Sequence, residues 1–125
     1  MNENELSKSI FDCCFKIHLS VGAGLFESAY EEILAYELSR QNLNFERQKA
    51  VSLKYGDITF GFGFRIAFFV KNKVILELKS LESILPVHRK QLLSYIKITN
   101  YNFGLFINFN STLMKDEIIR IVNNL

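Results

Sequence analysis

One short stretch of this 125-residue chain combines the pattern of a β-strand with a pair of opposite charges: Val74-Ile75-Leu76-Glu77-Leu78-Lys79. Because side chains alternate across a strand, Glu77 and Lys79 share one face, opposite Leu76 and Leu78. A carboxylate beside an ammonium group suits a metal-dependent phosphodiesterase, in which the acid binds the cation and the amine holds or polarises the attacking water. Taken alone, such a pair is more often a solvated ion pair on an exposed strand face.

The residues before this stretch also predict strands. From residue 45 onward, short runs rich in Val, Ile, Phe and Tyr are separated by turn signals at Gly56-Asp57 and Lys71-Asn72-Lys73. Gly61 and Gly63 interrupt the second run and predict a bend or bulge there. The expected strands cover three ranges: 45–55, 58–70 and 73–79.

Helices are expected on both sides of these strands. The spacing of apolar residues predicts amphipathic helices over about 5–20 and 26–40, with a break at the glycine-rich residues 22–24. After the third strand, Pro86 suits the first turn of a helix over about 87–98, because N–H groups there have no intrahelical partner.

The C-terminal part completes the expected domain. Residues 103–109 form a continuous apolar run, which predicts a central strand covered on both faces. Residues 113–122 place Ile118, Ile121 and Val122 on one side, which predicts a closing helix. The order of elements therefore indicates one α/β domain over residues 1–125, with a mixed central sheet of four to five strands flanked by helices.

Composition narrows the class of protein. The chain is 49% apolar but has no run of about eighteen apolar residues, so no membrane span is expected. The polar, acidic N-terminus differs from a secretory signal, and a cytoplasmic location is expected. The net charge of +2 neither requires nor excludes a nucleic-acid partner.

Cysteine and histidine provide no zinc site. Cys13 and Cys14 are adjacent in a helical pattern, where a disulfide between them would be strained, so two reduced cysteines in or beside the core are expected. The chain has only two histidines besides these cysteines, His18 and His88. A Cys/His zinc site therefore lacks ligands.

Two further pairs of residues could take part in chemistry. Glu27 and Tyr30 lie three apart at the start of the second expected helix, where an acid is commonly present for the helix dipole. Gln91 and Tyr95 lie four apart on the third helix and share a face. A Gln there can reach a phosphate or a water, but a polar residue at a helix edge is the more common explanation.

Seven blocks along the chain resemble, in the same order, those of a family of short bacterial and archaeal proteins named for its GxxExxY signature. They are Gly24-Leu25-Phe26-Glu27-Ser28-Ala29-Tyr30, Phe45-Glu46-Arg47-Gln48, Gly63-Phe64-Arg65, Val74-Ile75-Leu76-Glu77-Leu78-Lys79, Leu85-Pro86-Val87-His88, Gln91-Leu92-Leu93-Ser94-Tyr95 and Ile107-Asn108-Phe109. That family is grouped with the PD-(D/E)XK nucleases. The resemblance implies a restriction-endonuclease-like core over about 26–109, with additional helices at the N- and C-terminal ends.

The resemblance also implies roles for individual residues. Glu77 and Lys79 would be the catalytic ExK pair, and Glu27 would join Glu77 in binding Mg²⁺ or Mn²⁺. Gln91 and Tyr95 would form the catalytic and substrate-binding Q-x-x-x-Y element. Two other residues would contribute to binding a nucleic-acid substrate: Arg65 and His88.

One position departs from the family pattern. Two residues after the Arg of its G-[YF]-R segment, the family carries an Asp that binds the metal ion, whereas this chain has Ala67, which offers no side-chain oxygen. The chain is therefore expected to bind the metal weakly and to be inactive or impaired. Asp57 lies in a turn ten residues upstream and is no obvious replacement.

Three functional interpretations stay open. The first is a nuclease with one vacated ligand position, and the second is a non-catalytic module of the same fold that binds nucleic acid or a protein. The third is a structural or oligomerising module, suggested only by the many Phe residues, for which burial in the core is the more common explanation. DNA or RNA as substrate, the mode of cleavage and a homo-oligomeric state are left undecided.

The nuclease interpretation makes geometric predictions. Ala67 should lie opposite Glu77 and Arg65 opposite Lys79, which requires a turn with an odd number of residues. Glu27 and Gln91 should converge on the same patch.

Overall fold

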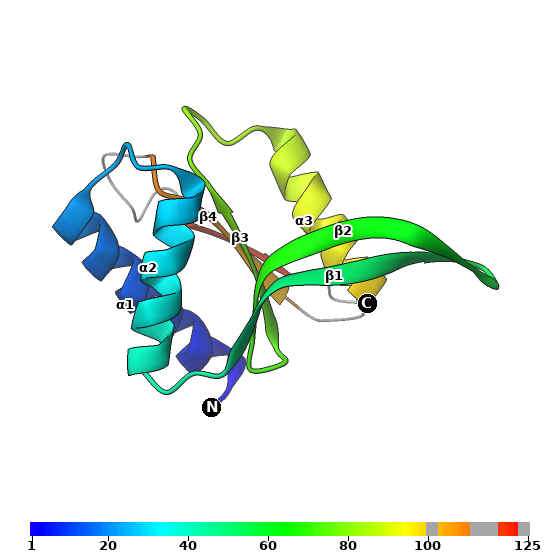
Figure 1. Ribbon diagram of the computed structural model, residues 1–125, viewed down its shortest axis with the longest axis horizontal. Coiled ribbons are helices and arrows are strands. Elements are labelled where there is room, and N and C mark those ends of the chain that lie inside the picture. The colour runs from blue at the N-terminus through cyan, green and yellow to red at the C-terminus, as the bar shows by residue number, and fades with distance from the viewer. Residues whose placement is uncertain (100–102, 111–117, 123–125) are drawn as a thin grey trace.

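The computed structural model describes residues 1–99, 103–110 and 118–122 (Figure 1). Within these residues it contains three helices and five strands in the order α1 (Glu3–Val21), α2 (Glu27–Arg40), β1 (Phe45–Tyr55), β2 (Ile58–Val70), β3 (Val74–Lys79), α3 (Pro86–Thr99), β4 (Phe103–Asn108) and β5 (Ile118–Val122).

The five strands form one sheet in the order β1-β2-β3-β4-β5. β1, β2 and β3 pair antiparallel through short turns, β3 and β4 pair parallel, and β5 returns antiparallel to β4. The parallel pair requires a crossover connection, which α3 provides. The predicted fold class, a mixed sheet flanked by helices, is confirmed.

The helices cover both faces of the sheet and create two apolar cores (Figure 1). α1 and α2 pack together on one face, where Tyr30, Leu34 and Leu105 belong to one cluster of buried apolar residues. α3 covers the other face, where Leu92 meets Phe106. β4 is buried along its whole length, as expected of a central strand with helices on both sides.

The predicted C-terminal helix is wrong for its last five residues. Ile118–Val122 is a strand at the edge of the sheet, paired with β4 in the register Ile107↔Ile118 to Phe103↔Val122. β-branched side chains favour extended backbone, and the buried β4 offers a ladder of hydrogen-bonding groups to any strand beside it. Residues 113–117 lie outside the described part of the chain.

The β1–β2 pair forms a long ribbon whose outer half extends beyond the helices (Figure 1). Only Phe68–Val70 of β2 pairs with β3, so the rest of the ribbon leaves the sheet. Its register shifts between Ser52 and Leu53, which pair with Gly63 and Phe60. The bulge predicted from Gly61 and Gly63 is thus confirmed.

The structure also tests two expectations from composition. Among the described residues, no helix combines the length and the apolar character needed to span a membrane. Cys13 and Cys14 are free thiols buried in the core, as expected. Burial raises the pKa of the Cys13 thiol to about 11, and it also raises the pKa of the Cys14 thiol. Both thiols are therefore protonated near neutral pH and act as packed side chains rather than as nucleophiles.

Candidate functional site

β2 and β3 stop pairing just before the residues that the sequence predicts to take part in metal binding and catalysis. Their pairing runs from Val70↔Val74 to Phe68↔Leu76 around a turn of three residues, 71–73. Continued by one step, this register places Ala67 across from Glu77, and by three steps it places Arg65 across from Lys79. The observed pairs have the register parity expected from the sequence, which the odd turn length sets, but Ala67–Glu77 and Arg65–Lys79 are not among the pairs that the described strands form.

Side chains from α2, β1, β2 and β3 line one cavity of about 180 Å³ at this fork. The cavity is lined by Glu27, Glu31, Gln48, Arg65, Ala67, Glu77, Leu78 and Lys79. Glu27 and Glu77 lie 50 positions apart in sequence, and the structure brings both to one cavity with Lys79 and Ala67. Charges of both signs from separate elements thus converge here.

Glu77 is the most perturbed acid of the site. Burial raises the pKa of its carboxyl group to about 7, and the charge of Glu27 adds to the rise. The Lys79 ammonium and a hydrogen bond from the Ala67 backbone oppose it. Its Oε1 is buried and has no hydrogen-bond partner among the described residues. A proton or a cation beside such a buried oxygen atom would stabilise it.

Glu27 is held at the start of α2 by the loop that follows β3. The backbone N–H of Ser80 donates to Glu27 Oε1 at 3.3 Å, and the Ser80 hydroxyl donates to the Leu25 carbonyl at 3.3 Å. Because Ser80 directly follows Lys79, this contact couples the position of Glu27 to the end of β3.

Tyr30 fixes the loop that precedes Glu27. Its hydroxyl donates to the Gly22 carbonyl and accepts from the Leu25 N–H at 3.2 Å, and its ring stacks on Phe109 at 4.3 Å. Gly24 has a φ of 104°, in a region of backbone conformation that residues with a Cβ atom rarely adopt. The glycine and the tyrosine of the signature therefore shape the chain, and the glutamate faces the cavity.

Tyr30→Phe is expected to lower the free energy of unfolding by about 1 to 2 kcal/mol, since it leaves two backbone groups of the loop without their partner. The control is Tyr36→Phe, the same change on an exposed part of α2, which should have an effect near zero. Urea unfolding measures both. Equal stability of the two variants would contradict the role assigned to Tyr30.

The residues predicted on α3 lie beside the cavity instead of lining it. Gln91 hydrogen-bonds Tyr95, and the pKa of Tyr95 is raised by burial and by the charge of Glu77. His88 accepts from the Leu85 N–H through Nδ1 at 2.9 Å and packs near the Phe106 ring. Tyr95 thus approaches Glu77 from α3, whereas His88 serves the first turn of that helix.

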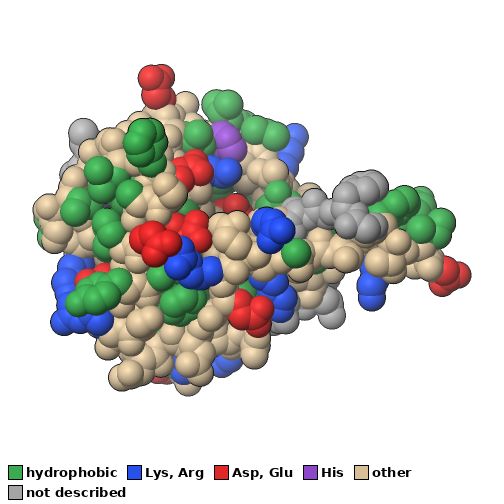
Figure 2. Space-filling model, in the orientation of Figure 1, with side chains coloured by type: hydrophobic (Ala, Val, Ile, Leu, Met, Phe, Trp, Pro, Cys, Tyr) green, Lys and Arg blue, Asp and Glu red, His purple; other side chains and the backbone are tan. Residues whose placement is uncertain are grey.

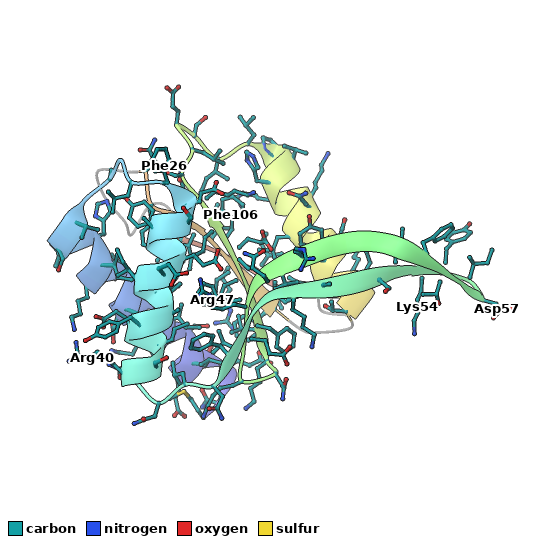
Figure 3. All side chains as sticks on the ribbon, viewed as in Figure 1. Phe26, Arg40, Arg47, Lys54, Asp57 and Phe106 are labelled. Atoms are coloured by element: carbon teal, nitrogen blue, oxygen red, sulfur yellow. The ribbon has the colours of Figure 1, made fainter. Side chains whose placement is uncertain are left out.

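Sequence reasoning missed a polar network that joins α2 to β1. Arg47 donates to Glu31 at 3.2 Å and to Glu32 at 2.6 Å, and Gln48 donates to Glu31 at 3.0 Å. Arg65 donates to the Gln48 carbonyl at 3.1 Å. Arg47 lies where the start of β1 passes α2 (Figure 3), and side chains of both charges gather there (Figure 2).

This network holds one wall of the cavity in place. Gln48 has a φ of 50°, unusual for a residue other than glycine, and its side chain reaches Glu31 from that conformation. The sequence block Phe45-Glu46-Arg47-Gln48 drew attention to the start of β1, but no sequence pattern marked Glu31 as a residue of the site.

The donor set fits a divalent cation in part. Glu27 and Glu77 supply carboxylates to the same cavity, and Glu77 Oε1 is a buried oxygen with no partner among the described residues. Mg²⁺ is commonly held by one or two carboxylates and several waters. No group of three His, Cys, Asp or Glu side chains suited to a metal occurs in the described part of the chain.

One comparison with known proteins covers nearly the whole chain. The family model of the PD-(D/E)XK nuclease superfamily matches residues 4–121. No curated protein matches the chain. The solved structure titled "Crystal structure of SSO0001" aligns with 93% of this chain and 76% of its own chain, at 15% identity and a TM-score of 0.45. On the match of the family model, the chain belongs to the PD-(D/E)XK nuclease superfamily, whose fold is that of metal-dependent nucleases.

Proposed function

We propose that this chain is a nucleic-acid-binding nuclease domain of the GxxExxY kind in which cleavage is impaired by Ala67. One observation carries the proposal: Glu27, Glu77 and Lys79 line a single cavity together with Ala67, which the β2–β3 register, continued by one step, places across from Glu77. A side chain of Asp at position 67 would add a further carboxylate beside those of Glu27 and Glu77, since the third acid of the cavity, Glu31, is already bound by Arg47 and Gln48.

The subfamily assignment is supported by what the signature residues do. Gly24 allows a left-handed backbone, Tyr30 holds the loop and Glu27 lines the cavity. Each signature residue therefore has a physical reason for its type.

The residues of the cavity have distinct proposed roles. Glu27 and Glu77 would hold Mg²⁺ or Mn²⁺, which when bound supplies an activated water and offsets charge on the phosphate. Lys79 places an ammonium group beside Glu77, where it can orient a water or a phosphate oxygen. Gln91 hydrogen-bonds Tyr95 beside the cavity, and Tyr95 is near enough to Glu77 for its pKa to be raised by that charge, so this pair would contact a water or phosphate bound next to Glu77.

Ala67 also affects the charge of the cavity. Its methyl group offers the cavity no oxygen, and its backbone instead donates a hydrogen bond to Glu77. One carboxylate fewer means less repulsion of a phosphate. We therefore propose that substrate binding persists where turnover is lost, which gives a non-catalytic binding module as the second candidate function.

Binding and cleavage of labelled oligonucleotides test this function. In chelator, the chain is expected to bind single-stranded or duplex DNA or RNA, with affinity that falls as salt rises. With Mg²⁺ or Mn²⁺ added, cleavage should stay near background. Cleavage that chelator abolishes would contradict the impairment, and absence of binding to all four substrates would contradict the nucleic-acid partner.

A further inference from the structure

A second concave surface lies where β1 passes the C-terminal end of α3. Residues of β1 between Lys49 and Lys54 form one wall, and residues 97–99 of α3 form the other, around a volume of about 650 Å³. Lys49, Lys54 and Lys97 line it, and among the residues that the structure describes no acidic side chain lines it. We call this surface the lysine groove.

The positive charge of the lysine groove is only partly balanced. Lys49 pairs with Glu46 at 3.5 Å and lies 4.8 Å from the centre of the Phe69 ring. Lys54 and Lys97 are exposed and form no ion pair with the described residues. Two uncompensated ammonium groups therefore line one concave surface, which attracts an anion with several charges.

The position of each lysine also has an explanation that does not involve an anionic ligand. Lys97 lies in the last turn of α3, where a cation stabilises the helix dipole. β1 is an edge strand, where Lys discourages pairing with another chain. Neither explanation predicts that ammonium groups from two separate elements should line the same groove, and neither predicts salt-dependent binding of a polyanion.

β1 contributes residues both to the lysine groove and to the cavity of the candidate site. Gln48 lines the cavity of Glu27 and Glu77, and the next residue, Lys49, lines the lysine groove. Lys54 lies six positions after Gln48, a distance of about 20 Å along a strand. A nucleic-acid strand carries a phosphate about every 3.4 Å of duplex axis, so it presents several charges over that distance.

We propose that the lysine groove binds the sugar–phosphate backbone of nucleic acid outside the cavity of Glu27 and Glu77, through Lys54 and Lys97. The choice of nucleic acid as the polyanion rests on the function proposed above. The projecting β1–β2 ribbon, which carries Lys54 near its outer end (Figure 3), thereby extends the contact surface beyond the cavity.

The test measures binding of a fluorescent oligonucleotide by the full chain in chelator, as a function of salt. Lys54→Gln and Lys97→Gln should each reduce the magnitude of the slope of log K against log salt by about 0.9 on duplex or about 0.7 on single strand. Affinity at 0.1 M salt should fall on the order of eightfold for each change, and the double variant should show both losses.

The matched control is Lys8→Gln, which removes the same charge from α1, where the lysine forms an exposed pair with Asp12. It should leave the slope unchanged, and circular dichroism should show that all variants are folded. Equal slopes for the double variant and Lys8→Gln would overturn the proposal. Equally tight binding of a poly-glutamate peptide, lost in the double variant, would overturn nucleic acid as the occupant.

This outcome is separable from that of the proposed function. Binding is measured without metal and without turnover, so loss of binding in the lysine variants supports the groove even where no variant cleaves. Cleavage that is restored at position 67 but insensitive to Lys54 and Lys97, with unchanged binding, would retain the nuclease and reject the groove.

Discussion

Ala67→Asp is expected to raise the affinity for Mn²⁺ or Mg²⁺ and to confer metal-dependent cleavage of DNA or RNA. The change adds a carboxylate to the cavity that Glu27, Glu77 and Lys79 also line. A cation held by three carboxylates instead of two is bound more tightly, because ligand charge raises affinity. Cleavage should rise by at least about 100-fold, which corresponds to about 2.7 kcal/mol of transition-state stabilisation.

Two controls separate restored chemistry from a change of shape. Ala67→Asn has nearly the same volume as the Asp variant but no charge, and should gain little. Ala67→Asp with Glu77→Ala should return to background, since it removes the partner carboxylate. Calorimetric metal titration and cleavage of duplex and single-stranded substrates measure these effects. The catalytic interpretation fails if Ala67→Asp neither binds metal more tightly nor cuts any substrate.

Glu77→Gln is expected to stabilise the metal-free protein at pH 8 by up to about 3 kcal/mol, with little effect at pH 4. The pKa of Glu77 is raised from its ordinary value of 4.5 to about 7, mainly by burial. Between these two values the folded protein binds more protons than the unfolded chain does. The free energy of unfolding therefore falls as pH rises from about 4.5 to about 7, and removal of the ionisable group removes that loss.

Urea unfolding in chelator at pH 4, 6 and 8 measures this dependence. Glu32→Gln is the matched control, because a hydrogen bond from Arg47 lowers the pKa of that exposed acid, so its effect on the pH dependence should have the opposite sign. A stability difference between Glu77→Gln and the unchanged chain that is the same at pH 4 and pH 8 would contradict the assigned pKa.

Most of the fold could be predicted because its elements have local signals. The alternation in 74–79, the apolar run before Phe109 and the glycine-rich break before α2 each depend on residues close together in sequence. The exception, β5, shows the limit. Residues 118–122 satisfy a helical spacing, and only the unpaired edge of β4 makes the strand more favourable.

The site was predictable where its geometry follows from one strand or one turn. Glu77 and Lys79 share a cavity because they alternate on β3. Ala67 lines the same cavity, and the three-residue turn sets a register that, continued by one step, places it across from Glu77. The place of Gln91 was not predictable to the same degree. Its helix packs on the other face of the sheet, and the tilt of that packing decides whether it lines the cavity.

The amino-acid sequence by itself therefore determined which chemical groups the protein has and which of them share a strand or helix face. Tertiary structure alone decided that Glu31 and Gln48 line the cavity, that Glu77 Oε1 has no hydrogen-bond partner within the described part of the chain, and that Lys54 and Lys97 line one groove. The physical reason is distance along the chain. Backbone periodicity acts over a few residues, whereas these contacts join elements that meet only when the helices dock on the sheet.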